Sequence, residues 1–176
     1  SIYSVELEYY TYEGYEILIP HVFGAEGKKK VISVSEGKRR KWDKGSFFKD
    51  AEERLDAKVY RAISTLYDFS EKKADEITWG TGISTGTFNP KFHSISVRSV
   101  YSVYSDGRLY INFGWLNDNE YTLQWREKLR KELRRISPIA DYIPETGDKY
   151  PGIPPEAWTP VVEEFMSVIT RLLEGG

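Results

Sequence analysis

The runs Val100-Tyr101-Ser102-Val103-Tyr104 and Leu109-Tyr110-Ile111-Asn112-Phe113 flank the tetrapeptide Ser105-Asp106-Gly107-Arg108. Apolar residues alternate along both runs, which is typical of half-buried strands. An Asp-Gly pair between two such runs favours a two-residue type I′ turn, because both central residues need a positive φ. We therefore expect an antiparallel hairpin that pairs Ser105 with Arg108 and Tyr104 with Leu109, and a domain organised around it.

This register divides the hairpin into two faces, because successive side chains of a strand point to opposite sides. The predicted core face carries Val100, Ser102, Tyr104, Leu109, Ile111 and Phe113. The predicted outer face carries Tyr101, Val103, Tyr110 and Asn112. The outer set is polar and aromatic, so we expect it to form either a binding surface or a second, wetter packing face.

Residues 77–88 extend the sheet and carry the pattern Gly80-x-Gly82-x-x-x-Gly86. A phosphate-binding glycine loop must open a helix, so that backbone N–H groups and the helix dipole meet the anion. Here the loop is followed by Thr87-Phe88-Asn89-Pro90, which is not a helix start. We therefore expect these glycines to serve a tight hairpin or bulge.

Helices are predicted where apolar residues recur at helical spacing behind a capping residue or proline. They begin near Ser46, Asp56, Thr122 and Pro155. The resulting fold class is α+β, an antiparallel sheet of four or more strands packed with helices. Residues 1–40 form a strand-rich segment, either the tail of an upstream domain or an extension of this one. Residues 41–176 form the α+β domain, and the start at Ser1 rather than Met favours a piece of a longer protein.

Composition excludes several classes of site. The 176 residues carry a formal charge of −2, so no global field predicts nucleic acid or a membrane as partner. The absence of cysteine excludes disulfides, thiolate zinc sites and a cysteine nucleophile. His21 and His93 lie far apart in sequence, which argues against a histidine metal site. With no membrane-spanning run and no signal peptide we expect a cytoplasmic protein, and the scarce Met beside abundant Lys, Glu and Arg favours a thermophilic source.

Three sets of residues are candidates for binding DNA or RNA: a basic connector, a basic helix face and two outer-face tyrosines. They are Lys38, Arg39 and Arg40; Arg126, Arg130 and Arg134; and Tyr101 and Tyr110. Cations contact phosphates, and aromatic rings stack on the bases of single strands. The alternatives are a solvated helix face, with cations favourable near a helix C-terminus, and aromatic side chains that only stabilise the sheet.

The tripeptide Glu36-Gly37-Lys38 follows the apolar run of residues 31–34. An apolar strand that ends in Glu-x-Lys is the arrangement of PD-(D/E)XK nucleases, in which the carboxylate holds a divalent metal such as Mg²⁺ and the lysine orients or activates water. No aspartate precedes Asp43, so Glu13, Glu16 or Glu26 would have to replace the aspartate of the motif, and the usual leading helix is missing. A metal-dependent nuclease that uses Glu36 and Lys38 is therefore an alternative hypothesis.

A resemblance to a known family covers residues 41–173. It is carried by Lys41-Trp42-Asp43-Lys44-Gly45-Ser46-Phe47-Phe48, Trp79-Gly80-Thr81-Gly82, Gly86-Thr87-Phe88-Asn89-Pro90, Ser105-Asp106-Gly107 and Ile111-Asn112-Phe113. These stretches resemble an uncharacterised prokaryotic domain attached to restriction-type or PD-(D/E)XK nuclease-like proteins. The resemblance implies an accessory or recognition domain in a DNA-processing or defence setting, with residues 1–40 as the tail of a nuclease-like neighbour. It supplies no catalytic residues.

The leading functional hypothesis is a non-catalytic, nucleic-acid-associated or regulatory domain with no cofactor. The second is the nuclease described above. The third is a protein-interaction module that forms a homodimer through the sheet face or the last helix.

Overall fold

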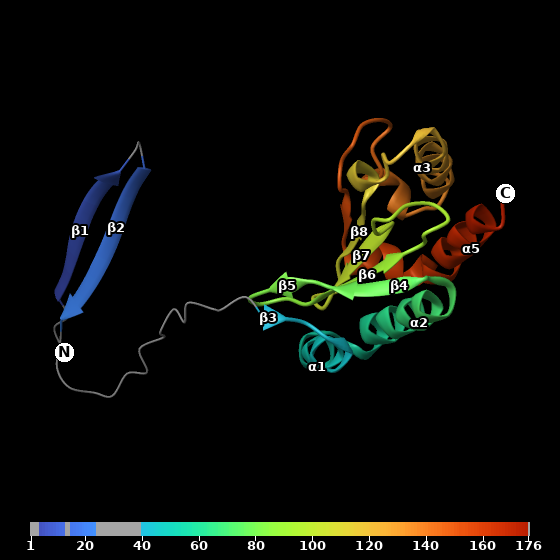
Figure 1. Cartoon of the computed structure of the whole chain (residues 1–176). Coiled ribbons are helices and arrows are strands. Elements are labelled where there is room, and N and C mark those ends of the chain that lie inside the picture. Colours follow the sequence, from blue (N-terminus) through green and yellow to red (C-terminus); the bar gives the residue numbers. More distant parts are fainter. Residues whose placement is uncertain (1–3, 13–14, 24–39, 176) are drawn as a thin grey trace. The chain divides into compact units, whose positions relative to one another are not determined.

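The computed structural model describes residues 4–12, 15–23 and 40–175 of the chain (Figure 1). The chain divides into two units, Ser1–Glu36 and Gly37–Gly176. In the first unit, β1 (Ser4–Tyr12) and β2 (Tyr15–Phe23) form an antiparallel ribbon. The ribbon confirms that the N-terminal segment contains strands. The further strand predicted over residues 31–34 lies outside the described residues.

The second unit contains an antiparallel sheet of five described strands in the order β4-β6-β7-β8-β9. The strands are β4 (Glu76–Trp79), β6 (Thr87–Lys91), β7 (Tyr101–Tyr104), β8 (Leu109–Ile111) and β9 (Gly152–Ile153). A separate two-stranded pair joins β3 (Arg40–Lys41) to β5 (Thr81–Gly82). This sheet and the helices around it confirm the predicted α+β class.

The glycines of the Gly80-x-Gly82-x-x-x-Gly86 pattern lie in this sheet region, as expected. Gly82 pairs with Arg40, and a Cβ atom added at Gly86 would lie 2.6 Å from the indole ring of Trp42. Gly86 is therefore required for a close approach of backbone to a buried tryptophan.

The helices begin at caps that differ in part from those predicted. They are α1 (Lys44–Arg54), α2 (Ala57–Lys73), α3 (Glu120–Leu133), α4 (Pro155–Trp158) and α5 (Val162–Leu173), with 3₁₀ turns η1 (Phe113–Trp115), η2 (Ile139–Tyr142) and η3 (Thr159–Val161). Asp56 caps α2, as expected. Asp43 and Asn119 cap α1 and α3, each accepting a hydrogen bond from the backbone N–H three residues on. Ser46 and Thr122, the expected caps, are those N–H donors.

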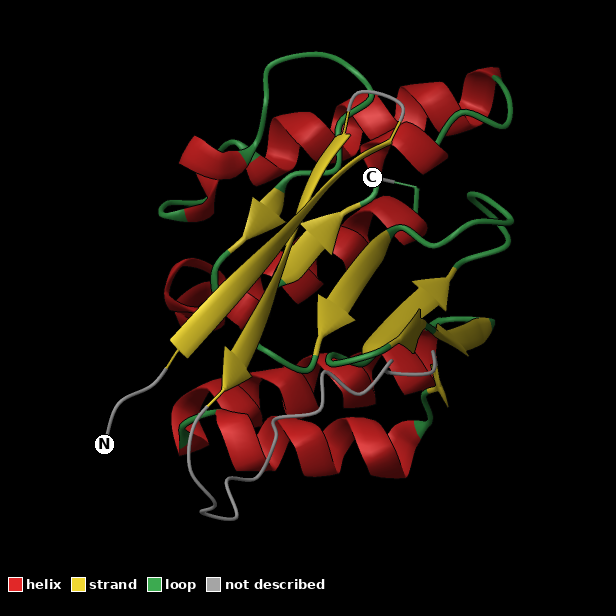
Figure 2. Ribbon diagram, turned by 90° about the vertical axis from the view of Figure 1, so that its left-hand side faces the viewer, coloured by secondary structure: helices red, strands yellow, loops and turns green. Residues whose placement is uncertain are grey.

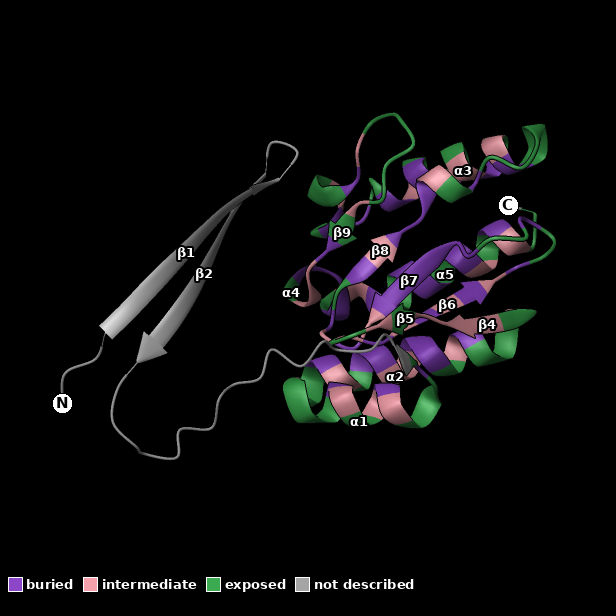
Figure 3. Cartoon of the chain, turned by 60° about the vertical axis from the view of Figure 1, so that its left-hand side comes forward, coloured by how far each residue is buried: buried purple, intermediate pink, exposed green. Residues whose placement is uncertain are grey.

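The helices cover one face of the sheet. Figure 2 looks onto the strands of this unit, with helices behind, above and below them. The side chains of Phe88, Val103 and Ile111 are fully buried, as are those of Leu66 in α2 and Ile169 in α5. Figure 3 shows buried residues along β6 and β7 and along the helices that pack against the sheet. Within residues 40–175, no helix lies across the opposite face. Among helices in the described part of the chain, none is long and apolar enough to cross a membrane.

The hairpin forms, but its predicted register is wrong by one residue. Val103 pairs with Leu109 and Ser102 with Tyr110. The N–H of Gly107 donates to the carbonyl of Tyr104 at 3.0 Å, so the loop has three residues and ends in a glycine with φ of 93°. This is the type I turn followed by a left-handed residue, in which only the glycine needs a positive φ.

The register shift exchanges the two faces of β7 relative to β8, because side chains alternate with a period of two. Tyr101 and Val103 therefore face the core with Leu109 and Ile111, and all four side chains are fully buried. The predicted outer position of Tyr101 is wrong: its hydroxyl bonds to Ser70 of α2 at 2.7 Å, and its ring packs edge-on against a phenylalanine of α5. The open face instead receives Ser102 and Tyr104, beside Tyr110 and Asn112.

Candidate functional site: the polar face of the sheet

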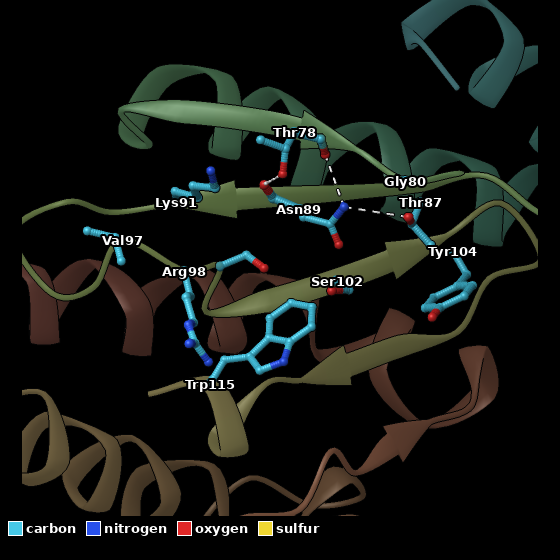
Figure 4. A pocket seen from close by; sticks show the side chains of 11 residues that line it. Thr78, Gly80, Thr87, Asn89, Lys91, Val97, Arg98, Ser102, Tyr104 and Trp115 are labelled. Atoms are coloured by element: carbon cyan, nitrogen blue, oxygen red, sulfur yellow. Dashed lines mark hydrogen bonds between the residues drawn. The ribbon is translucent and has the colours of Figure 1, made fainter. Parts of the chain in front are cut away.

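The face of the sheet opposite the helices of residues 40–175 carries a cavity of about 550 Å³ (Figure 4). Cavities of this size are typical of sites for small ligands or for one unit of a polymer. Its floor comes from β4, β6 and β7, and its rim from the loop of residues 97–99 and from η1. Among the side chains that line it are those of Thr78, Thr87, Asn89, Arg98, Ser102 and Trp115.

Alternation along β6 explains why this floor is polar. In the run Thr87-Phe88-Asn89-Pro90-Lys91, Phe88 is fully buried on the helix side, whereas Thr87, Asn89 and Lys91 line the cavity. One strand thus carries the core on one side and the site on the other.

Hydrogen bonds fix the orientation of the Asn89 amide. Its Nδ2 donates to the carbonyl of Thr78 at 3.1 Å and to Oγ1 of Thr87 at 3.5 Å. The amide protons are therefore directed along the sheet, and the side-chain oxygen points into the cavity (Figure 4). Asn89 presents a fixed hydrogen-bond acceptor to any ligand there.

A second asparagine, Asn112, forms hydrogen bonds that hold Ser102 of the neighbouring strand β7. Nδ2 of Asn112 lies 2.9 Å from Oγ of Ser102 and 3.2 Å from Oγ of Ser99. Because Ser102 accepts that hydrogen bond, its own hydroxyl proton remains to be donated. The floor of the cavity thus offers a donor on β7 beside the acceptor on β6.

Aromatic side chains stand at both ends of this face. The rings of Tyr104 and Tyr110 lie 5.0 Å apart, and the guanidinium of Arg108 lies over both. Burial, followed by the neighbouring Tyr110, raises the pKa of Tyr104, so its phenol remains neutral at physiological pH. The indole of Trp115, 37% exposed, packs edge-on against Tyr150.

The charge at the cavity is positive. Lys91 lies 3.0 Å from Glu76, which offsets its charge. Arg98 is exposed on the rim, and in the described part of the chain no carboxylate lies within ion-pair distance of it. No described acidic side chain lines the cavity.

The loop that carries Arg98 is held by a short chain of hydrogen bonds. Oγ of Ser96 donates to Asp118 at 2.5 Å and accepts from the backbone N–H of Arg98 at 3.0 Å. Asp118 also accepts from the N–H of Val97 at 3.3 Å. Because Ser96 is buried, this network fixes the backbone from which the Arg98 side chain extends.

Arg126, Arg130 and Arg134 do not form one freely accessible cationic row: Arg130 is buried, Arg134 is exposed, and each of the three is paired with a carboxylate. Arg130 is 3% exposed in its side chain, where it contacts Glu127 and donates to the carbonyls of Pro144 and Gly147. Arg126 pairs with Glu127 and Asp148, while Arg134 pairs with Glu145 and the carbonyl of Ile143. The three arginines therefore fasten the loop between η2 and β9, and their contact with phosphates stays a prediction.

The remaining predicted site residues are placed as follows. Tyr110 lies on the open face, as expected, and Arg40 begins β3. Glu36, Lys38 and Arg39 lie outside the described residues. Among the residues that are described, no group of three or more histidine, aspartate or glutamate side chains is placed to hold a metal ion.

Sequence analysis missed Asn89 and Ser102 as site residues. The signal for Asn89 was present, because polar residues alternate with Phe88 along β6. Ser102 was assigned to the core because a two-residue turn was predicted where the loop has three residues. The position of Arg98 at the start of a strand left open whether it is paired or lies at the mouth of a site, and only the tertiary fold brings Trp115 to the same rim.

Comparisons with known proteins return nothing: no family model, no curated protein and no solved structure matches the chain. The resemblance to a nuclease-associated domain therefore stays an expectation.

Proposed function

We propose that this chain is a non-catalytic domain that binds single-stranded nucleic acid across the polar face of its sheet. The observation that carries the proposal is the combination of Trp115, Tyr104 and the unpaired Arg98 around a cavity without described acidic residues. Non-specific single-strand binders combine a cationic groove with aromatic side chains on which bases stack. A cytoplasmic DNA-processing or defence protein is the setting that this activity fits.

The positive charge that attracts a nucleic-acid strand must come from this face itself, because the whole chain carries a net charge of −2. Each phosphate that a cation neutralises on a single strand contributes about −0.7 to the slope of log affinity against log salt. Because Arg98 is unpaired whereas Lys91 forms an ion pair with Glu76, we expect a shallow slope of log affinity against log salt of about −1. Stacking then supplies much of the affinity, and duplex DNA, whose bases are inaccessible, binds more weakly.

Fluorescence anisotropy with labelled strands of about 12 nucleotides tests the proposal. DNA and RNA single strands and the matching duplex are titrated at several salt concentrations. We expect Trp115→Ala and Arg98→Ala each to weaken single-strand binding about tenfold. The matched controls, Tyr121→Ala and Arg61→Ala, alter exposed residues on α3 and α2 and leave affinity unchanged. No binding at low salt, or equal losses in the controls, would reject the proposal.

The same samples test the two alternative hypotheses. Cleavage of the strands on addition of Mg²⁺, abolished by Lys38→Ala, would replace the proposal by a nuclease that uses Glu36 and Lys38. A stable homodimer in light scattering that binds no strand would favour the interaction module.

A further inference from the structure

The cavity differs from a plain stacking surface in its floor, where polar groups are held in fixed directions. A binder that reads no sequence needs aromatic planes and cations, but no oriented donor and acceptor. Here the Asn89 amide is locked by Thr78 and Thr87, and Ser102 is held by the buried Asn112. Such pre-organisation is what hydrogen-bonding recognition of a base edge requires.

We infer that the cavity binds one nucleotide unit, with its base edge on Asn89 and Ser102 and its phosphate at Arg98. This inference rests on the proposed function and deepens it. Every base presents hydrogen-bond donors and acceptors side by side along an edge, which complements an acceptor on β6 next to a donor on β7. The cavity volume of about 550 Å³ accommodates a single nucleotide.

The phosphate position follows from Arg98. A guanidinium presents a planar fork of donors that matches phosphate oxygens, and no described carboxylate competes for this one. The bonds from Ser96 and Asp118 hold the backbone at Arg98 in place before a ligand arrives. Ser96 and Asp118 are therefore positioning residues, and neither contacts the nucleotide.

Two aromatic side chains complete the proposed nucleotide site. Trp115 and Tyr104 both line the cavity, from η1 and from the end of β7, so a base on the floor has a ring surface within the same site. Unlike stacking, the floor contacts depend on base identity.

The test compares a single strand carrying bases with an abasic strand of equal length and charge. We expect the base-bearing strand to bind about tenfold more tightly, and homopolymers of the four bases to differ from one another. Ser102→Ala reduces the differences between homopolymers, and Ser167→Ala, on the exposed side of α5, does not. Arg98→Ala weakens base-bearing and abasic strands by the same factor, because it removes a phosphate contact.

A second arm separates a unit of a strand from a free nucleotide. Nucleoside monophosphates and the corresponding nucleosides are titrated while the backbone amide resonances of Ser102 and Arg98 are followed by NMR. We expect shifts with the monophosphates that are weaker with the nucleosides. Asn89→Ala is a further variant, and retained thermal unfolding of each protein confirms that it is folded.

The outcomes distinguish this inference from the proposed function. Equal affinity for abasic and base-bearing strands would overturn the nucleotide site and leave single-strand binding standing. Monophosphate binding without strand binding would support the site and reject the proposed function. Absence of both would overturn both.

Discussion

The hydroxyl groups of Ser70 and Tyr101 lie 2.7 Å apart in the core, where α2 meets β7. Ser70 donates its only hydroxyl proton to the carbonyl of Leu66 at 2.6 Å, so Tyr101 must be the donor to Ser70. Burial raises the pKa of the Tyr101 phenol well above its usual value, which keeps that proton in place. This pair fastens the central strand to the helix layer.

Tyr101→Phe is expected to lower the free energy of unfolding by about 1 kcal/mol, because Ser70 loses a donor but keeps its bond to Leu66. Tyr104→Phe, on the opposite face of the same strand, should change it by less than about 0.5 kcal/mol. Urea unfolding measures both. A loss of nucleic-acid affinity in Tyr101→Phe at unchanged stability would contradict the inward position of this ring.

Gly107→Ala is expected to destabilise the hairpin by about 2 kcal/mol, since Gly107 has φ of 93° and an added Cβ would lie 3.1 Å from Pro155. Gly147→Ala is the matched control: its φ is 94°, and nothing lies within 4 Å of the added atom. It should cost about 1 kcal/mol, the backbone contribution alone. Equal losses in the two variants would show that the contact with Pro155 is not tight.

Arg130→Met is expected to cost about 3 kcal/mol, because Glu127 and the carbonyls of Pro144 and Gly147 lose a buried partner. Lys131→Met, at the exposed neighbouring position, should cost less than about 0.5 kcal/mol. Thermal or urea unfolding gives the difference, and faster amide exchange over residues 144–147 would locate it. If Arg130→Met instead weakened nucleic-acid binding at unchanged stability, the phosphate role predicted from sequence would be right.

The register of the hairpin could not be predicted from the local sequence pattern. Asp106-Gly107 suits a two-residue turn and equally a three-residue turn in which only the glycine is left-handed. Ser105 decides between them: its hydroxyl donates to Asp50 of α1 at 2.6 Å and accepts from the N–H of Gly86 at 2.9 Å. Those partners are distant in sequence, so the hairpin could be predicted but the facing of Tyr101 and Ser102 could not.

The hydrogen-bond partners of the arginine row could not be predicted, for a related reason. Its spacing correctly placed Arg126 and Arg130 on α3, with Arg134 at the C-cap. The loop that accepts their hydrogen bonds has no sequence periodicity from which its position could be predicted. From the sequence alone, a row of cations beside Glu127 suggests a solvent-exposed helix face. Only the three-dimensional structure shows which loop carbonyls accept hydrogen bonds from these arginines. The β6 alternation, by contrast, needed no tertiary information, because Phe88 and Asn89 differ enough in polarity to assign their faces.

The N-cap of α2 predicts a pH dependence of stability. The Asp56 carboxylate accepts from the N–H groups of Val59 at 3.0 Å and Lys58 at 2.8 Å, and these bonds lower its pKa. A carboxyl whose pKa is lower in the folded than in the unfolded state stabilises the fold fully above the unfolded pKa of about 4. That contribution is lost as the pH falls through the folded pKa.

Asp56→Asn keeps an acceptor at the cap but cannot titrate, so its unfolding free energy should fall less steeply than that of the wild type between about pH 5 and pH 2. Glu52→Gln removes an exposed carboxylate that caps no helix, and serves as the control for loss of a charge. Urea unfolding at a series of pH values measures the slopes. Identical slopes for Asp56→Asn and the wild type would mean that the bonds to Lys58 and Val59 are as strong with the neutral acid as with the carboxylate. The hydrogen-bonded cap would then make no pH-dependent contribution to the stability of α2.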